Sequence, residues 1–326
     1  MIGKDFKPRD VISGRRLYII CGTLFLVAML WFNVIGLQVS SSYEPSIRRH
    51  PYAIVTHVQN EEYVPITLNL CYTVQKYNPN IPYEKIILLP TDHTVSPMSL
   101  ARFQELGWTL RLEEPIEVEG SENLPANYRR NFVKLHIWKW IEFRKLAYID
   151  GDCLVLGDIS LLLSEGIGTT SFYSNQDFGA VRDTWPWAMP SDNFNAGVMS
   201  LTPSLEIYNQ LFEITTTRPT PPGAEQDILN VFFPPVSMDN TRPEYTRTDL
   251  PMKYNLNMEA CRAERLTDRF NEIWPHARIL HFTGPAKGNT GECNDPGCNC
   301  AAHNTWKDEY KEMCMKYGWS TGESLY

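Results

Sequence analysis

Short apolar runs alternate with segments of helical periodicity along most of the chain. The runs at 53–58 (AIVTHV), 84–90 (EKIILLP) and 145–150 (KLAYID) have the length and composition of buried strands. Between the first two lies 64–77 (VPITLNLCYTVQKY), where apolar residues recur at helical spacing. This alternation predicts an α/β domain with a mostly parallel central sheet.

The same alternation continues toward the C-terminus. The segment 131–143 (NFVKLHIWKWIEF) has the apolar spacing of a helix half buried in the core, and on such a helix Lys134 could be no more than a solvated charge. The remaining expected elements are helices at 96–106, 204–214 and 224–233, and strands at 108–112, 193–203 and 277–282.

A different pattern stands at the N-terminus. Residues 17–37 carry no charge, and at about 1.5 Å per residue they span about 30 Å, enough to cross a bilayer core. Five basic residues precede this run, and none follows it until Arg48. By the positive-inside rule, 1–16 is a cytoplasmic tail, 17–37 a transmembrane signal anchor and 38–52 a stem. The alternative is a cleaved signal peptide, whose apolar region would be shorter. The rest of the chain is then lumenal, in the Golgi or another secretory-pathway membrane.

Composition and charge narrow the function. The net charge is -8 with 43% hydrophobic residues, so the chain can build a core and has no basic stripe for nucleic acid. The tail at 290–326 reads as an extension that holds four of the eight cysteines: Cys293, Cys298, Cys300 and Cys314. In an oxidising lumen these favour disulfides over a zinc site with His303, and the spacing leaves the pairing open.

Two carboxylates stand at the end of the strand expected at 145–150. Asp150 and Asp152 flank a glycine, and the carboxyl ends of parallel strands are where ligands bind in open sheets. Mg²⁺ and Mn²⁺ favour such oxygen ligands together with substrate phosphates. The alternative is a polar turn, which Asp and Gly also favour. Burying two neighbouring carboxylates without a cation would be costly, which favours the metal.

A second group of candidates begins in the strand at 277–282 and continues into the loop after it. His281 alone is more often a hydrogen-bonded structural residue than a metal ligand. Gly284 would allow close backbone approach, and Lys287 would supply a charge suited to phosphate, so the three form a candidate diphosphate clamp.

Seven blocks of sequence, in this order, resemble the family 8 retaining glycosyltransferases, the group that contains glycogenin and the galactinol synthases. They are THVQNEEY (56–63), VKLHIWKW (133–140), LAYIDGDCLVLGDI (146–159), FNAGVMSLTPS (194–204), EQDILN (225–230), LPMKYN (250–255) and HFTGPAKG (281–288). Blocks in a shared order are far more specific than any one of them. The resemblance implies a GT-A fold, here a single domain at 53–289.

The resemblance also implies roles for individual residues. Asp150, Asp152 and His281 look like ligands of Mn²⁺ (or Mg²⁺), and Gly284 and Lys287 like contacts to the donor diphosphate. Residues similar to those that hold the uridine are Thr56, Asn60 and Tyr63. Residues similar to those near the donor sugar and the anomeric carbon are Lys134, Asp183, Asn195, Ala196, Gly197 and Gln226.

Two departures from the family pattern concern the sugar and the acceptor. Glu225 stands where the glycogenin pattern has Asp, and Gly288 with Asn289 replaces the usual Pro-Trp.

From the resemblance as a whole we expect a metal-dependent retaining transferase that moves a hexose from a UDP-sugar to a hydroxyl of a glycan, glycoprotein, glycolipid or small polyol. The alternatives are a UDP-sugar hydrolase and a catalytically silent lumenal nucleotide-sugar-binding module. Donor sugar, linkage, the presence of a covalent intermediate and oligomeric state are left open by the sequence.

Overall fold

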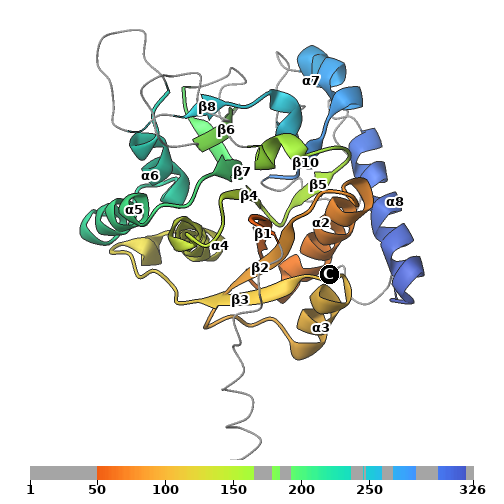
Figure 1. Cartoon of the computed structure of the whole chain (residues 1–326), viewed down its shortest axis with the longest axis horizontal. Helices are drawn as coiled ribbons and strands as arrows, with labels where there is room; N and C mark the ends of the chain where they lie inside the picture. The colour runs from red at the N-terminus through yellow and green to blue at the C-terminus, as the bar shows by residue number, and fades with distance from the viewer. Residues whose placement is uncertain are drawn as a thin grey trace, which may run out of the picture. The chain divides into compact units, whose positions relative to one another are not determined.

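A seven-stranded sheet organises the described residues from His50 onward (Figure 1). The computed structural model describes residues 50–164, 178–183, 192–235, 245, 247–258, 267–283 and 300–320. The sheet order is β3-β2-β1-β4-β7-β6-β8. The strands are β1 (Tyr52–His57), β2 (Glu84–Pro90), β3 (Thr109–Glu113), β4 (Lys145–Ile149), β6 (Phe178–Arg182), β7 (Phe194–Leu201) and β8 (Thr248–Asp249).

Strand direction confirms the prediction of a mostly parallel sheet. β3, β2, β1 and β4 pair in parallel, and β7 pairs antiparallel with both β4 and β6. β8 is parallel to β6, so β7 alone of the seven strands runs against the others. A smaller sheet combines β5 (Cys153–Val155), β10 (Ile279–His281) and β9 (Leu256–Asn257). Its middle strand, β10, is antiparallel to β5 and parallel to β9.

The pleat of the strands divides the core into two clusters. Ile54 of β1 lies in one cluster, and its neighbours Ala53 and Val55 lie in the other, as expected for a strand buried on both faces. Helices α2 (Val64–Tyr77), α3 (Pro97–Glu105) and α8 (Cys300–Tyr317) contribute to the first cluster. Helices α5 (Leu205–Thr217) and α6 (Ala224–Phe232) contribute to the second. The remaining helices are α4 (Ala126–Arg130), α7 (Thr267–Ile273), η1 (Glu61–Tyr63), η2 (Ser121–Asn123), η3 (Asn131–Lys139), η4 (Ser160–Leu163), η5 (Met252–Tyr254) and η7 (Trp274–His276).

The segment 131–143 differs from the half-buried helix that its periodicity predicts. It forms the 3₁₀ helix η3, which ends at Lys139, and its residues from Phe132 to Trp138 are all buried. Lys134 is among them, with a side chain 1% exposed, so its interpretation as a solvated charge is wrong. The segment lies between the sheet and α5, and apolar periodicity cannot reveal that both of its sides are covered.

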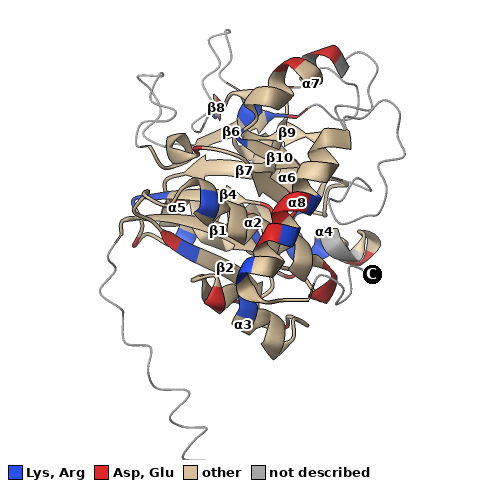
Figure 2. Ribbon diagram, turned by 90° about the vertical axis from the view of Figure 1, so that its right-hand side faces the viewer, with Lys and Arg blue, Asp and Glu red and all other residues tan. Residues whose placement is uncertain are grey.

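The C-terminal residues contain a helix that the sequence analysis did not expect. α8 packs against α2, and Trp306 and Met313 join the first core cluster. Across the same contact Lys76 binds Glu309 and Glu312, and α8 shows both charge colours beside α2 in Figure 2. Cys300 is disulfide-bonded, as expected for the cysteines of the C-terminal extension. The expectation of a disulfide at Cys314 is wrong, because Cys314 is a buried free thiol.

No helix within the described ranges has the length and apolar character needed to cross a membrane. The expected anchor at 17–37, with the cytoplasmic tail and nearly all of the stem, lies outside those ranges.

Candidate active site

The candidate site lies where the central sheet meets the smaller one. Asp150 follows β4, Asp152 precedes β5, and His281 ends β10. Gly151 between the two carboxylates is sterically required, since a Cβ there would lie 2.5 Å from Oγ1 of Thr67 and 3.0 Å from the carbonyl oxygen of His57. The turn therefore packs tightly against α2, and this packing sets the position of both carboxylates.

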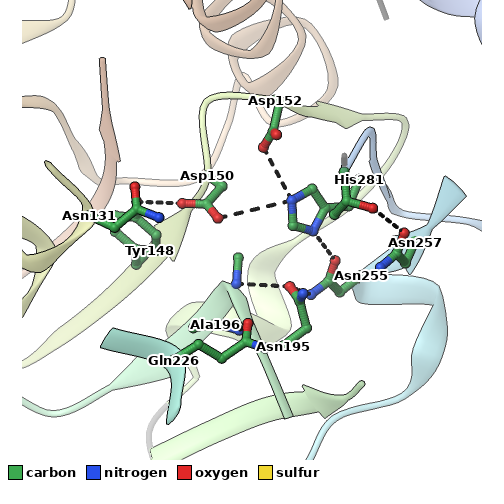
Figure 3. A network of polar contacts seen from close by, with 12 residues as sticks. Asn131, Tyr148, Asp150, Asp152, Asn195, Ala196, Gln226, Asn255, Asn257 and His281 are labelled. Atoms are coloured by element: carbon green, nitrogen blue, oxygen red, sulfur yellow. Dashed lines mark hydrogen bonds and ion pairs between the residues drawn. The ribbon is translucent and has the colours of Figure 1, made fainter. Parts of the chain in front are cut away.

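His281 faces both carboxylates (Figure 3). Its Nε2 lies 3.1 Å from Oδ1 of Asp152 and 4.0 Å from Oδ2 of Asp150. Gly197 of β7 makes room for the ring, because a Cβ at that position would lie 2.2 Å from Cε1 of His281. The histidine, two aspartates and a glycine come from three distant parts of the chain.

A chain of hydrogen bonds sets the tautomer of His281. The backbone N–H of Gly197 donates to Oδ1 of Asn195 (2.9 Å), which therefore is an acceptor. Nδ2 of Asn255 donates to the same oxygen (2.9 Å), so Oδ1 of Asn255 points the other way, to Nδ1 of His281 at 2.9 Å. Nδ1 must then carry a proton, so in the neutral ring the lone pair is on Nε2, the nitrogen that faces the carboxylates.

This donor set fits a hard divalent cation. Two carboxylates and a neutral imidazole with an orienting partner are ligands that Mn²⁺ accepts. The tightest group of potential ligands in the described part of the chain is Asp152, Cys153 and His281, whose ligand atoms lie within 4.8 Å of one another. Asp150 stands outside that group, but its Oδ2 lies 4.0 Å from the same Nε2 and would complete the ligand set of a shared ion.

The other oxygen of Asp150 is held by a buried lysine. Lys134 Nζ lies 3.1 Å from Oδ1 of Asp150 and 2.9 Å from Oε1 of Glu225. Burial lowers the pKa of Lys134, but the two carboxylates outweigh it and raise that pKa above its ordinary value. Burial raises the pKa of Glu225, and Lys134 opposes that rise. Burial also acts to raise the pKa of Asp150, yet the ammonium of Lys134 keeps it below the usual range.

Tyr148 and His57 extend this network on the other side. The hydroxyl of Tyr148 donates to Oδ1 of Asp150 at 2.6 Å and lies 2.5 Å from Nδ1 of His57. Burial lowers the pKa of His57 to about 4, so its ring is neutral near pH 7. Three residues of this network were not predicted to belong to the site: Tyr148, His57 and Asn255. Their only signal in the sequence was a position inside one of the matching blocks.

Three of the predicted sugar-side residues meet near the start of β7. Oε1 of Gln226 accepts from the backbone N–H of Ala196 (2.9 Å), and its Nε2 donates to Oδ2 of Asp183 (3.0 Å). Both ends of the amide are therefore fixed. Asp183 is itself 6% exposed at the end of β6, next to the strand that carries Ala196.

The predicted uridine residues lie in β1 and directly after it. Asn60 caps η1 by accepting from the N–H of Tyr63 (3.3 Å), and the carbonyl of Tyr63 accepts from Thr67 (2.9 Å), the residue that packs on Gly151. Thr56 is fully buried, and its Oγ1 has no hydrogen-bond partner. Gly284 and Lys287 lie outside the described residues, so the diphosphate clamp stays a prediction.

Comparison with known proteins gives the site its context. Residues 54–288 match the model of glycosyl transferase family 8. Rabbit (Oryctolagus cuniculus) glycogenin-1 is 30% identical over 47% of this chain and 40% of its own length. Galactinol synthase 3 of Arabidopsis thaliana is 28% identical over 68% of each chain. The chain thus spans less than half of the glycogenin that it matches.

Solved structures show the same fold at low identity. The bifunctional glycosyltransferase WbbM aligns with a TM-score of 0.59 and 14% identity, covering 83% of this chain and 52% of that one. The galactosyltransferase LgtC aligns with a TM-score of 0.52 and 19% identity, covering 80% and 95%. These likenesses support the GT-A type of fold. Because the family model matches most of the chain, the protein belongs to glycosyl transferase family 8.

Proposed function

We propose that the protein is a metal-dependent, retaining glycosyltransferase that moves a hexose from a UDP-sugar to an acceptor hydroxyl. The single observation that carries this proposal is the convergence of Asp150, Asp152 and His281 with the lone pair of Nε2 turned inward. Family membership supports the same reaction class. The bound cation would supply charge neutralisation for the leaving diphosphate.

The chain's own residues would divide the remaining work. Lys134 already contacts two carboxylates, those of Asp150 and Glu225, so we assign it to holding Asp150 in place rather than to direct contact with the diphosphate. Gln226, fixed at both ends, would present a rigid polar surface to the sugar. Lys287 would supply the charge that meets the diphosphate.

Location and acceptor belong to the proposal as well. The uncharged run at 17–37 and the basic residues before it support a type II anchor in a Golgi or other secretory-pathway membrane. A lumenal acceptor would then be a glycan, glycoprotein, glycolipid or small polyol. Sealed microsomes treated with protease should retain the catalytic domain, and its digestion without detergent would refute this topology.

The reaction can be tested by UDP release. A panel of UDP-sugars with Mn²⁺ should give release for at least one donor, lost in excess EDTA and in Asp152→Asn. Asp158→Asn is the matched control, because Asp158 is exposed after β5 and caps only Ser160. Release that needs an acceptor indicates transfer, and release from donor alone indicates hydrolysis. Metal-dependent UDP binding without any turnover would replace the transferase with a binding module.

A further inference from the structure

One buried thiol lies beside the candidate metal ligands. Cys153 begins β5 and pairs directly with His281 across the antiparallel ladder between β5 and β10. Side chains opposite each other in such a ladder project from the same face of the sheet. Cys153 is fully buried and is not part of a disulfide.

The ligand atoms lie close enough together to meet on one small tetrahedral ion after a shift of about 1 Å. The ligand atoms of Asp152, Cys153 and His281 all lie within 4.8 Å of one another, and Nε2 and Oδ1 are 3.1 Å apart. Bonds of about 2.0 Å to nitrogen and oxygen and about 2.3 Å to sulfur place tetrahedral ligands roughly 3.3–3.7 Å apart. Nε2 of His281 already presents its lone pair, so the imidazole needs no change of tautomer.

We propose that Asp152, Cys153 and His281 form an alternative site for a thiophilic divalent cation, Zn²⁺ in particular. The thiol loses its proton to water on binding, and sulfur, nitrogen and oxygen each donate a lone pair, with no change of oxidation state. Because Asp152 and His281 would serve both ions, Zn²⁺ at this site excludes the hard cation that also needs Asp150. Zn²⁺ is therefore an inhibitor that competes with Mn²⁺, and this last step rests on the proposed function.

Ligand chemistry gives the competition its direction. A site of mixed N, O and S ligands binds Zn²⁺ more tightly than Mn²⁺. Mn²⁺ has the lowest affinity of the divalent first-row metal ions for a given site, and sulfur favours the softer ion, Zn²⁺. The ordinary alternative is that Cys153 only fills space in the core, as buried cysteines commonly do. Cys71 provides the comparison, because it is a fully buried thiol on α2 outside the described metal-ligand group.

Co²⁺ is a suitable spectroscopic probe, since a thiolate ligand gives it a strong charge-transfer absorption in the near ultraviolet. The purified protein should show this band, Cys71→Ala should keep it, and Cys153→Ala should lose it. Cys153→Ser is the second variant and keeps the side-chain volume. Competition against a chromophoric chelator should show Zn²⁺ affinity at least tenfold weaker in both Cys153 variants and unchanged in Cys71→Ala.

Inhibition provides the second measurement. Zn²⁺ should inhibit Mn²⁺-supported UDP release, excess Mn²⁺ should relieve it, and both Cys153 variants should need at least tenfold more Zn²⁺. An absent cobalt band, or equal Zn²⁺ affinity with and without Cys153, overturns the site. If no donor releases UDP, the proposed function fails, while the cobalt band and the Zn²⁺ affinities still decide the metal site.

Discussion

The hydrogen bond between Asn255 and His281 allows a quantitative test of the candidate metal centre. In Asn255→Leu, Nδ1 of His281 loses the amide oxygen that accepts its hydrogen bond, at 2.9 Å, inside a site where the imidazole is 3% exposed. The ring must either keep an unsatisfied N–H or move the proton to Nε2, the atom that faces the carboxylates. Either result weakens metal binding.

The magnitude follows from two separate estimates. An unsatisfied buried donor costs about 1–3 kcal/mol. Loss of the partner that orients a ligating histidine typically costs about 10- to 100-fold in metal affinity, or about 1.4–2.7 kcal/mol. The estimates agree, so we expect Asn255→Leu to bind Mn²⁺ at least tenfold more weakly.

Titration calorimetry of the purified protein with Mn²⁺ measures this directly. Asn255→Asp keeps an acceptor for Nδ1 and should stay within about threefold of wild type. The matched control is Asn257→Leu, since Asn257 follows closely in the chain but bonds Thr283. A Mn²⁺ affinity of Asn255→Leu within twofold of wild type would refute the tautomer argument.

Three further outcomes are expected. Lys134→Met leaves the buried carboxylate of Glu225 and the partly buried one of Asp150 without their cation. It should destabilise the fold by about 3–5 kcal/mol, measured by denaturant unfolding, and replacing Glu225 with Gln in the same chain should recover part of that loss. Gly197→Ala places a methyl group against the histidine ring and should abolish Mn²⁺ binding while the far-ultraviolet circular dichroism is kept, so unchanged binding would contradict the described packing. Burial lowers the pKa of His136 below its ordinary 6.5. Below pH 6.5 this side chain is therefore protonated in the unfolded chain to a greater extent than in the folded one. Unfolding free energy should therefore fall as pH drops from 7 toward 5, and less steeply in His136→Asn.

Local patterns predicted much of the fold because its strands are compact apolar runs. The segments expected as the first strands and helices coincide with β1, α2, β2, α3 and β4 to within about two residues at each end. The direction of β7 could not be predicted, because an apolar run does not encode the orientation of its neighbours. α8 was missed although Ala302, Trp306, Tyr310 and Met313 have helical spacing, since the cysteines around them indicated a disulfide-rich extension.

The candidate site was predictable only in part. The resemblance named Asp150, Asp152 and His281, and the structure brings these three side chains together. It could not indicate that Lys134 is bound on both sides by carboxylates, because the partner Glu225 lies 91 positions further along the chain. Long-range pairing of this kind depends on the tertiary fold and leaves no local periodicity.

The contact between α2 and α8 can form only late in the synthesis of the protein, after α8 has been translated. Lys76 and its partner Glu309 are separated by 233 positions. At about 5–20 residues per second, a ribosome needs roughly 10–50 s to cover that distance. Throughout this interval the face of α2 that packs against Trp306 and Met313 in the folded protein is not yet buried by α8. The nascent chain must spend that time with exposed apolar surface, which makes this stage the point at which chaperones would be needed most.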